Sequence, residues 1–223
     1  MGVILERLWW GLVRFGFRLL YNELAFTYDL VSWAVSLGQW RAWQRTALRH
    51  LYPDVPLGAA VLEVAHGTGD LQIDLHAAGW RAAGLDRSPY MGRIAGRKLR
   101  RHGLAAPLAR ADALALPFAS ARFAAVVSTF PAPFILEPRA LCEVSRVLCP
   151  GGRLVIVASS RLTGRGVLAR LLEIAYDITG QRGPWPVDAL MARFAQAGLA
   201  AEVITERLAA SEVALIVAHK ARA

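Results

Sequence analysis

The sequence predicts an α/β fold in which a mostly parallel sheet is covered by helices on both faces. Short apolar runs alternate with longer helical patterns from about residue 60 onward, which is typical of such sheets. A glycine-rich turn, within VLEVAHGTGDL at 61–71, follows the first of these runs. Acidic residues end several runs, at the side of the sheet where parallel α/β proteins bind ligands.

Three helical patterns precede the sheet. They cover residues 3–22, 25–36 and 39–50. A chain of 223 residues is long enough for one well-buried α/β domain, whereas two full domains would be a tight fit. We therefore expect an amphipathic N-terminal helix over 1–24 and one domain over 25–223.

The alternation from residue 60 onward predicts seven strands. They lie at 60–65, 81–86, 106–110, 123–129, 153–159, 200–206 and 212–219. The intervening helices are expected directly after Gly69 and at 89–102, 137–148, 164–177 and 187–197. Residues 150–152, Pro-Gly-Gly, predict a turn. The last two strands have no helix between them, which predicts an antiparallel pair at the edge of the sheet.

The chain is strongly basic, with a formal net charge of +9. Such a charge suits nucleic acid or an anionic membrane surface. Only Lys98 and Lys220 are lysines, and no known nucleic-acid-binding motif accompanies the scattered arginines, so we expect no nucleic-acid binding. The basic run at 93–102 is interpreted as a solvated helix face, with contact to anionic lipid as the alternative.

Two cysteines, Cys142 and Cys149, lie in an apolar helical pattern without metal-like spacing. We interpret them as small buried residues of a protein in a reducing compartment. The expected location is therefore cytoplasmic, and no metal site is expected.

Residues 3–20 are strongly apolar, but charged residues interrupt the run. Glu6 and Arg7 break the pattern of a signal peptide, and the longest uncharged stretch, 8–13, is shorter than the span of about 20 residues that a membrane requires. One narrow stripe of the helix consists of Arg7, Gly11, Arg14 and Arg18. Two interpretations remain open: residues 1–20 lie peripherally on the inner face of a membrane, or they pack on the protein itself or on a partner subunit.

The glycine turn excludes two of the three cofactor sites that use such a turn. A phosphate-binding P-loop requires Gly-Lys-Ser/Thr, which is absent. A dinucleotide site places a third glycine where this chain has Asp70, and a carboxylate there would repel a pyrophosphate. S-adenosylmethionine has no phosphate and carries a sulfonium cation, an amino-acid end, a ribose and an adenine, so it suits an acidic turn.

Four acidic residues lie where they could contact such a cofactor. Glu63 and Asp70 flank the turn and could face a cation or an ammonium group. Asp86 ends the second strand, from which an acidic side chain can reach ribose hydroxyls. Asp112 follows the third strand and could accept a hydrogen bond from the adenine amino group. Ser88 is explained as a helix N-cap, so Asp86 is left without an expected structural role.

Several motifs resemble those of class I S-adenosylmethionine-dependent methyltransferases, from about residue 26 to the C-terminus. The likeness is greatest to the ubiquinone/menaquinone biosynthesis C-methyltransferase family, whose Ala-Gly-Gly-Thr-Gly-Asp turn corresponds to residues 65–70. Further matches are DALALPF at 112–118, RFAAVVSTF at 122–130 and EVSRVLCPGGRLVIV at 143–157. Upstream, YDLVSWAVSLGQWRAWQR at 28–45 follows the family's pattern of Tyr-Asp, Ser-x-Gly and Arg-x-x-Trp.

The resemblance implies a Rossmann-like class I methyltransferase fold, methyltransferase activity and S-adenosylmethionine as the cofactor. It also implies that the helices at 25–50 form a lid over the cofactor, with Tyr28 in that lid. The candidate cofactor-binding residues are Tyr28, Glu63, Ala65, Gly67, Thr68, Gly69, Asp70, Asp86, Arg87, Ala111, Asp112, Ala113 and Ser128.

The chain departs from the family's pattern at two places. The family's Phe-Gly-x-Arg-Asn after the fourth strand, which helps to shape the quinone site, is replaced by an apolar loop. The candidate substrate-lining residues there are Thr129, Phe130, Pro131 and Phe134. His66 stands where the family has a glycine and is a candidate catalytic base, with an N–H contact to the cofactor or a plain surface position as alternatives.

Together, the cofactor motifs, the apolar loop and the N-terminal helix predict methyl transfer to a hydrophobic, membrane-resident small molecule that is quinone-like or a lipid. Two alternatives remain open, a phospholipid amine N-methyltransferase and a cofactor-binding but inactive partner in a membrane complex. The methylated atom and the oligomeric state do not follow from the sequence.

Overall fold

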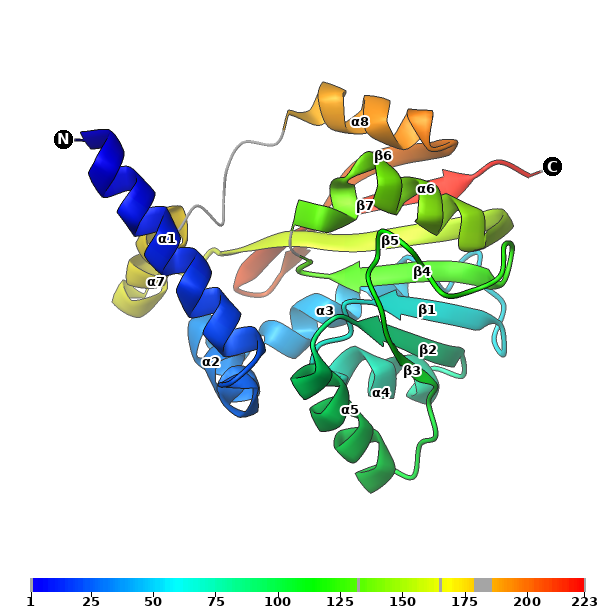
Figure 1. Ribbon diagram of the computed structural model, residues 1–223, viewed down its shortest axis with the longest axis horizontal. Coiled ribbons are helices and arrows are strands. Elements are labelled where there is room, and N and C mark those ends of the chain that lie inside the picture. Colours follow the sequence, from blue (N-terminus) through cyan, green and yellow to red (C-terminus); the bar gives the residue numbers. More distant parts are fainter. Residues whose placement is uncertain (1, 132, 165, 179–185, 223) are drawn as a thin grey trace.

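The computed structural model describes residues 2–131, 133–164, 166–178 and 186–222, and the structural statements below concern these residues. Their strands form one seven-stranded sheet with helices on both faces (Figure 1). The strands are β1 Ala60–Val64, β2 Arg81–Asp86, β3 Leu108–Arg110, β4 Phe123–Thr129, β5 Leu148–Leu162, β6 Leu199–Leu208 and β7 Ser211–Lys220. Their order is β3-β2-β1-β4-β5-β7-β6, and β7 pairs antiparallel with β5 and β6. The mostly parallel sheet with an antiparallel C-terminal edge is therefore confirmed.

Three helices precede the sheet at the predicted places. They are α1 Gly2–Tyr21, α2 Tyr28–Val35 and α3 Trp40–Arg49, with the short 3₁₀ helix η1 Ala25–Thr27 before α2. The remaining helices are α4 Asp70–Ala77, α5 Pro89–Arg101, α6 Pro138–Val147, α7 Val167–Ile178 and α8 Val187–Gln196, with the 3₁₀ helix η2 Pro133–Leu136 before α6. Ser88 is the N-cap of α5, because its hydroxyl accepts a hydrogen bond from the backbone N–H of Met91.

Alternate residues of the central strands point to opposite faces of the sheet and form two buried clusters. On β5, Leu154 and Ile156 pack with α6 and α8, whereas Val155 and Val157 pack with α3 and α4. Burial on both faces explains why these strands are continuously apolar in the sequence. Because β1 to β5 pair in parallel, their carboxyl ends lie at one edge of the sheet, where the glycine turn follows β1.

Two local predictions are wrong. Residues 150–152, predicted to form a turn, lie within β5, where they interrupt the pairing with β4 between Leu148 and Arg153. Cys142, predicted to be buried, is exposed on α6, and Cys149 is partly buried on β5. The helical pattern did not resolve which side of α6 faces the core.

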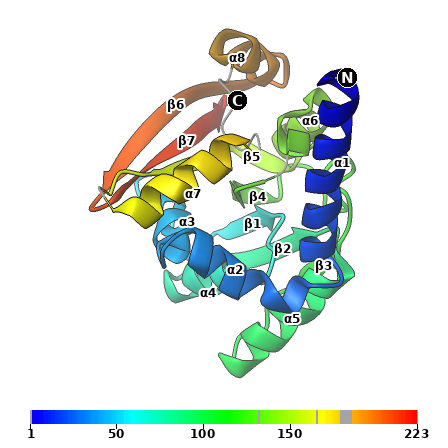
Figure 2. The ribbon, with the colours of Figure 1, turned by 90° about the vertical axis from the view of Figure 1, so that its left-hand side faces the viewer.

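Figure 2 shows the side of the molecule at which the parallel strands end, with α1, α2 and α7 in front of the sheet. The side chains of Arg7 and Arg14 lie outside the described residues, whereas Arg18 is exposed. Among the described helices, none has the length and apolar character that a membrane crossing requires.

Candidate functional site

The glycine turn joins β1 to α4 at the carboxyl edge of the sheet. Its backbone has a positive φ at Ala65 (61°), Gly67 (53°) and Gly69 (86°), a region that favours glycine. Gly69 has a second reason to be glycine, since a Cβ there would lie 2.9 Å from the Cβ of Ala95 on α5. A Cβ at Gly67 would instead meet no atom within 4 Å, so this part of the turn is open to a ligand.

Asp86, at the end of β2, faces the turn. Its Oδ2 accepts a hydrogen bond from the backbone N–H of Gly67 at 2.9 Å, and its Oδ1 accepts one from Ser88 at 2.8 Å. The expectation that Asp86 lacks a structural role is therefore wrong, because it fixes the turn to the start of α5. An ionised carboxylate has about four acceptor positions, so two remain for ligand hydroxyls.

Glu63 lies on β1 beneath the turn and is fully buried. Its Oε2 accepts a hydrogen bond from the Nε2 of Gln72 at 2.8 Å, while its Oε1 has no hydrogen-bond partner. Burial raises the pKa of Glu63 to about 8, so the carboxyl group is mostly protonated at neutral pH. An unpartnered buried oxygen is costly, and a ligand N–H or O–H group that donated a hydrogen bond to Oε1 would remove this cost.

We expect Glu63→Gln to change how stability depends on pH. The pKa of Glu63 is about 8 in the folded chain against 4.5 for the free group, so the folded state keeps a proton that the unfolded state loses between these values. Across this window the free energy of unfolding of the wild type should fall, relative to the variant, by up to about 1.4 kcal/mol per pH unit as pH rises. Urea unfolding of both proteins as a function of pH measures the difference, and parallel profiles would contradict it.

His66 is buried against β2 and not placed at the surface, so the surface alternative is wrong. Its ring packs over Gly84, where a Cβ would come within 2.9 Å of the ring Cδ2. Its Nδ1 lies 2.8 Å from the carbonyl oxygen of Gly67, so the neutral ring donates from Nδ1 and has its unprotonated nitrogen at Nε2. Burial lowers the pKa of His66, although Asp86 acts in the opposite direction. The base role stays a prediction.

An ion-pair cluster connects α2, the glycine turn and α5. The Nζ of Lys98 donates to Asp29 and to Asp70, each at 2.8 Å, and to the hydroxyl of Thr68 at 3.3 Å. The Thr68 hydroxyl donates in turn to Asp29 at 2.5 Å. We call these four residues the lid latch, because they fasten α2 over the turn. The solvated interpretation of the run at 93–102 is thus wrong for Lys98, and Asp70 already faces a cation.

We expect Lys98→Met to loosen the lid latch. Without the ammonium group, the carboxylates of Asp29 and Asp70 lose their shared counter-ion and repel each other. Backbone amides of α2 should then exchange hydrogen roughly tenfold faster, which corresponds to about 1.4 kcal/mol of opening free energy, while those of β4 should be unchanged. Hydrogen-exchange mass spectrometry measures this, with Arg97→Met on the exposed side of α5 as the control. If the amides of α2 exchange hydrogen at the same rate in Lys98→Met and Arg97→Met, the lid latch does not hold α2 in place.

A row of aromatic rings runs from α1 to the end of β4. The row consists of Phe17, Tyr21, Tyr28, Trp40 and Phe130, whose successive ring centroids are 6.1, 5.7, 6.2 and 4.4 Å apart. These spacings are those of favourable aromatic pairs. Tyr21 is exposed, and the other four residues are partly buried. The aromatic row therefore offers ring-shaped apolar surface beside the lid latch, and it includes the predicted lid residue Tyr28.

The predicted substrate-lining residues fall on both sides of the sheet. Thr129 is buried and accepts a hydrogen bond from the Nε2 of Gln44 on α3 at 3.1 Å, and Phe130 stacks on Trp40. Phe134, on η2, packs instead against the cluster beneath α6 and α8. The structure thus brings Thr129 and Phe130 together beside α3, with the half-buried Pro131 next to them. Phe134 lies on the other face of the sheet.

The remaining predicted residues include two with local structural roles. Asp112 is exposed, and its Oδ1 accepts a hydrogen bond from the backbone N–H of Leu114 at 3.0 Å. The segment 111–113 follows β3, whose Arg110 pairs with Asp86, so Asp112 lies near the end of β2. Ser128 is buried, and its hydroxyl donates to a carbonyl oxygen of β1 at 2.7 Å. Arg87 is exposed.

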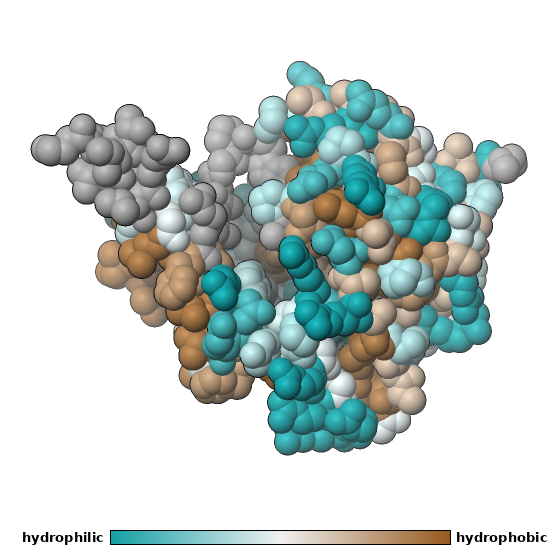
Figure 3. Space-filling view, in the orientation of Figure 1, coloured by the Kyte–Doolittle hydropathy of each residue, from teal (hydrophilic) through white to brown (hydrophobic). Residues whose placement is uncertain are grey.

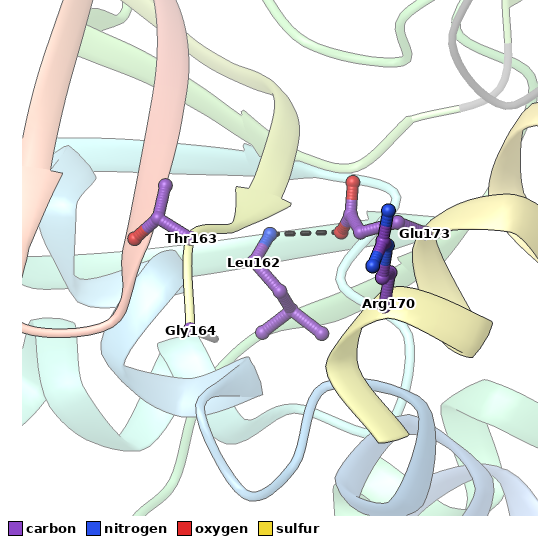
Figure 4. A pocket seen from close by; sticks show the side chains of 5 residues that line it. All are labelled: Leu162, Thr163, Gly164, Arg170 and Glu173. Atoms are coloured by element: carbon purple, nitrogen blue, oxygen red, sulfur yellow. Dashed lines mark hydrogen bonds between the residues drawn. The ribbon is translucent and has the colours of Figure 1, made fainter. Parts of the chain in front are cut away.

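A pocket of about 410 Å³ opens between the end of β5 and α7 (Figure 4). Its lining residues are Leu162, Thr163, Gly164, Arg170 and Glu173. The carboxylate of Glu173 accepts a hydrogen bond from the backbone N–H of Leu162 at 2.8 Å. None of the predicted site residues lines this pocket, so it is distinct from the glycine turn.

Sequence reasoning missed Lys98, Asp29 and Trp40 as parts of the site. Lys98 could have been singled out, because it is one of two lysines in a chain whose other basic residues are arginines. Asp29 belongs to the Tyr-Asp pair at 28–29, of which only the tyrosine was assigned. Nothing in the sequence indicates that Trp40 stacks on Phe130.

Several known proteins are similar to this chain in sequence. A family described as a methyltransferase domain matches residues 61–152. The demethylmenaquinone methyltransferase of Thermus thermophilus is 40% identical over 141 residues, which cover 62% of this chain and 63% of that protein. The demethylmenaquinone methyltransferase of Tropheryma whipplei is 32% identical over 169 residues, 70% of this chain and 69% of that protein. The match to the first of these relatives therefore spans less than two thirds of its length.

Solved structures share the fold. A putative S-adenosyl-L-methionine-dependent methyltransferase from Methanococcus maripaludis aligns with a TM-score of 0.64 over 89% of this chain and 92% of its own, at 16% identity. Phosphoethanolamine N-methyltransferase 2 of Haemonchus contortus aligns with a TM-score of 0.60 over 80% of this chain and 53% of its own, also at 16% identity. At this identity the likeness concerns the fold alone, and it confirms the Rossmann-like class I methyltransferase fold.

Proposed function

The chain belongs to the demethylmenaquinone and ubiquinone/menaquinone C-methyltransferase family, and we propose that it transfers a methyl group from S-adenosylmethionine to a quinone-like, membrane-resident acceptor. One observation carries this proposal. An acidic glycine turn without phosphate-binding residues lies next to the partly exposed aromatic row. Helix α2 connects the two, because Asp29 of the lid latch and Tyr28 of the row are neighbours on it. A phosphate-free cofactor and a planar apolar acceptor suit these two neighbouring surfaces.

The residues at the turn fit S-adenosylmethionine in their chemistry. Asp86 has two acceptor positions left for the ribose hydroxyls, and the unpartnered Oε1 of Glu63 can accept a hydrogen bond from the amino group of the cofactor. The open side of Gly67 leaves room beside the turn. When bound, the cofactor would supply a methyl group attached to a positively charged sulfur. S-adenosylhomocysteine, which remains after the transfer, is a good leaving group. The chain's own residues then have to orient the acceptor and exclude water.

The aromatic row is the proposed site of the acceptor ring. A planar ring can stack on Trp40 and Phe130, and an apolar tail can follow Tyr28 and Tyr21 toward α1. Methylation of a ring carbon also needs a base to remove a proton, and we assign this role to His66. The lowered pKa of His66 favours the neutral ring that a base requires.

In this proposal, residues 1–20 contact the cytoplasmic face of a membrane. Leu12 and Phe15 of α1 are exposed, as expected for a helix that lies in a membrane interface. The Leu12→Glu/Phe15→Glu variant tests this contact by flotation with phospholipid vesicles. If the variant floats with the vesicles as well as the wild type does, the result would instead support the alternative, in which α1 packs on protein.

The proposed activity is tested by incubating the purified protein with isotopically labelled S-adenosylmethionine and membrane lipid extracts, followed by mass spectrometry. A labelled quinone supports the proposal, and the His66→Asn variant should then lose turnover while it keeps cofactor affinity. Labelled phospholipid amines would support the N-methyltransferase instead. Cofactor binding without any labelled product would support an inactive partner in a membrane complex.

A further inference from the structure

Helix α7 turns five of its large apolar side chains away from the protein. They are Val167, Leu168, Leu171, Ile174 and Ile178. Their exposure lies between 49% and 77%, and their spacing places them on one stripe of the helix. The inward side carries Ala169 and Leu172, which pack on the core, together with Glu173 and Tyr176. Figure 4 shows Glu173 directed toward the end of β5. The more apolar side of the helix thus faces outward, the reverse of an ordinary surface helix.

Helix α2 shows the same inversion. Leu30 and Trp33 are 67% and 62% exposed, whereas Ser32 on the inward side is 5% exposed. Phe26 of η1 and the side chains of Trp9, Leu12 and Phe15 on α1 are also exposed. We call the exposed apolar residues of α1, η1, α2 and α7 the outer apolar face. Figure 3 shows hydrophobic residues gathered over α1 and α2 on this side.

The helices of the outer apolar face are joined by hydrogen bonds. The indole N–H of Trp9 on α1 donates to the carbonyl oxygen of Ile178 on α7 at 3.3 Å. The hydroxyl of Tyr176 on α7 donates to the carbonyl oxygen of Val35 on α2 at 3.3 Å. Figure 2, which views this side directly, shows α1, α2 and α7 in front of the sheet. The three helices therefore present their apolar side chains on one side of the molecule.

The charges around this face favour an anionic partner. Arg18 on α1 and Arg170 on α7 are exposed, and Arg161 at the end of β5 is 64% exposed. Two described carboxylates on these elements are engaged, since Glu173 pairs with Arg161 at 3.7 Å and Asp29 pairs with Lys98 at 2.8 Å. Two copies with a net charge of +9 would repel each other across a shared basic rim, which disfavours a second copy as the occupant.

We propose that the outer apolar face seats the protein on an anionic phospholipid bilayer, with α2 and α7 in contact with lipid as well as α1. Exposed Trp and Phe beside Arg are typical of the membrane–water interface. This inference rests on the membrane contact proposed for residues 1–20 and extends it to two further helices. The aromatic row begins on α1 and ends at β4 on the same side, so a lipid-soluble acceptor reaches it directly from the bilayer.

The test compares two double variants of the full chain by flotation with vesicles of equal parts phosphatidylcholine and phosphatidylglycerol. Leu171→Glu/Ile174→Glu places charge on α7, at positions that are exposed and should tolerate it. Leu57→Glu/Val203→Glu is the matched control, because these exposed residues lie before β1 and on β6, away from the face. The α7 variant should lose at least about tenfold in vesicle affinity, because two apolar side chains no longer enter the bilayer and two carboxylates would have to be desolvated there.

The expected result is that the control floats like the wild type and the α7 variant remains in the aqueous phase. Both variants should keep the melting temperature and cofactor affinity of the wild type. Flotation of the α7 variant equal to that of the wild type would overturn the proposal. A wild-type dimer that the α7 variant abolishes, without vesicle binding by either protein, would also overturn it. Methylation of a short-chain, water-soluble quinol is measured in parallel, so a failure of the proposed activity remains distinguishable from a failure of docking.

Discussion

Replacement of Asp86 by alanine is expected to weaken the binding of S-adenosylmethionine at least about 100-fold. Each hydrogen bond to a charged acceptor contributes about 1.5–3 kcal/mol, and the ribose diol would lose two of them. The variant also loses the acceptors for the N–H groups of Gly67 and Ser88, so the turn itself should become less ordered. Isothermal titration calorimetry with the purified protein measures the dissociation constant.

Asp188→Ala is the control for this experiment. Asp188 is an exposed carboxylate in the first turn of α8, on the face of the sheet opposite α3 and α4. Its removal changes the net charge by the same amount and should leave cofactor affinity unchanged. If Asp86→Ala binds the cofactor as tightly as Asp188→Ala does, Asp86 does not hold the ribose.

The largest loss of stability is expected for Trp43→Ala, at about 3–5 kcal/mol of unfolding free energy. Trp43, on α3, has no exposed surface, and its indole N–H donates to the hydroxyl of Ser211 at 2.8 Å. The same hydroxyl donates to Gln39 at 2.7 Å, so Ser211 connects the start of β7 to the N-terminal end of α3. Removal of the indole leaves a cavity and an unpaired hydroxyl acceptor.

Trp33→Ala on α2 provides the matched comparison, because it removes the same side chain from a position that is 62% exposed. Its effect on urea-induced unfolding should stay within about 0.5 kcal/mol. A similar loss in both variants would mean that α3 is not anchored to the core through Trp43.

Hydrophobic periodicity was sufficient to predict the order of the elements and most of their bounds. The run at 123–129 was placed correctly, because a strand buried on both faces is apolar without interruption and ends at turn residues. The final strands, β6 and β7, were recognised as antiparallel because no helix separates them. By contrast, Pro150 to Gly152 lies inside β5, since a strand can accommodate extra residues where its pairing is interrupted.

Those parts of the candidate site that depend on one local turn could be predicted from the sequence. Those parts that are formed by segments far apart in the sequence could not. The glycine turn and Asp86 could be recognised because strand ends converge at one edge of a parallel sheet. The lid latch could not, since the position of Asp29 over Thr68 depends on how α2 packs against a segment far away in the sequence. Likewise, the pattern of α7 indicates an apolar side, but only the packing shows that this side faces outward.

The most direct test of the proposed activity is product analysis with a purified hydroquinone that lacks one ring methyl group. The protein is incubated with this quinol in phospholipid vesicles and with labelled S-adenosylmethionine. We predict equal amounts of S-adenosylhomocysteine and of a quinol methylated at a ring carbon, both strongly reduced in Asp86→Ala. If the folded, cofactor-bound protein yields no methylated quinol, the proposed activity is contradicted.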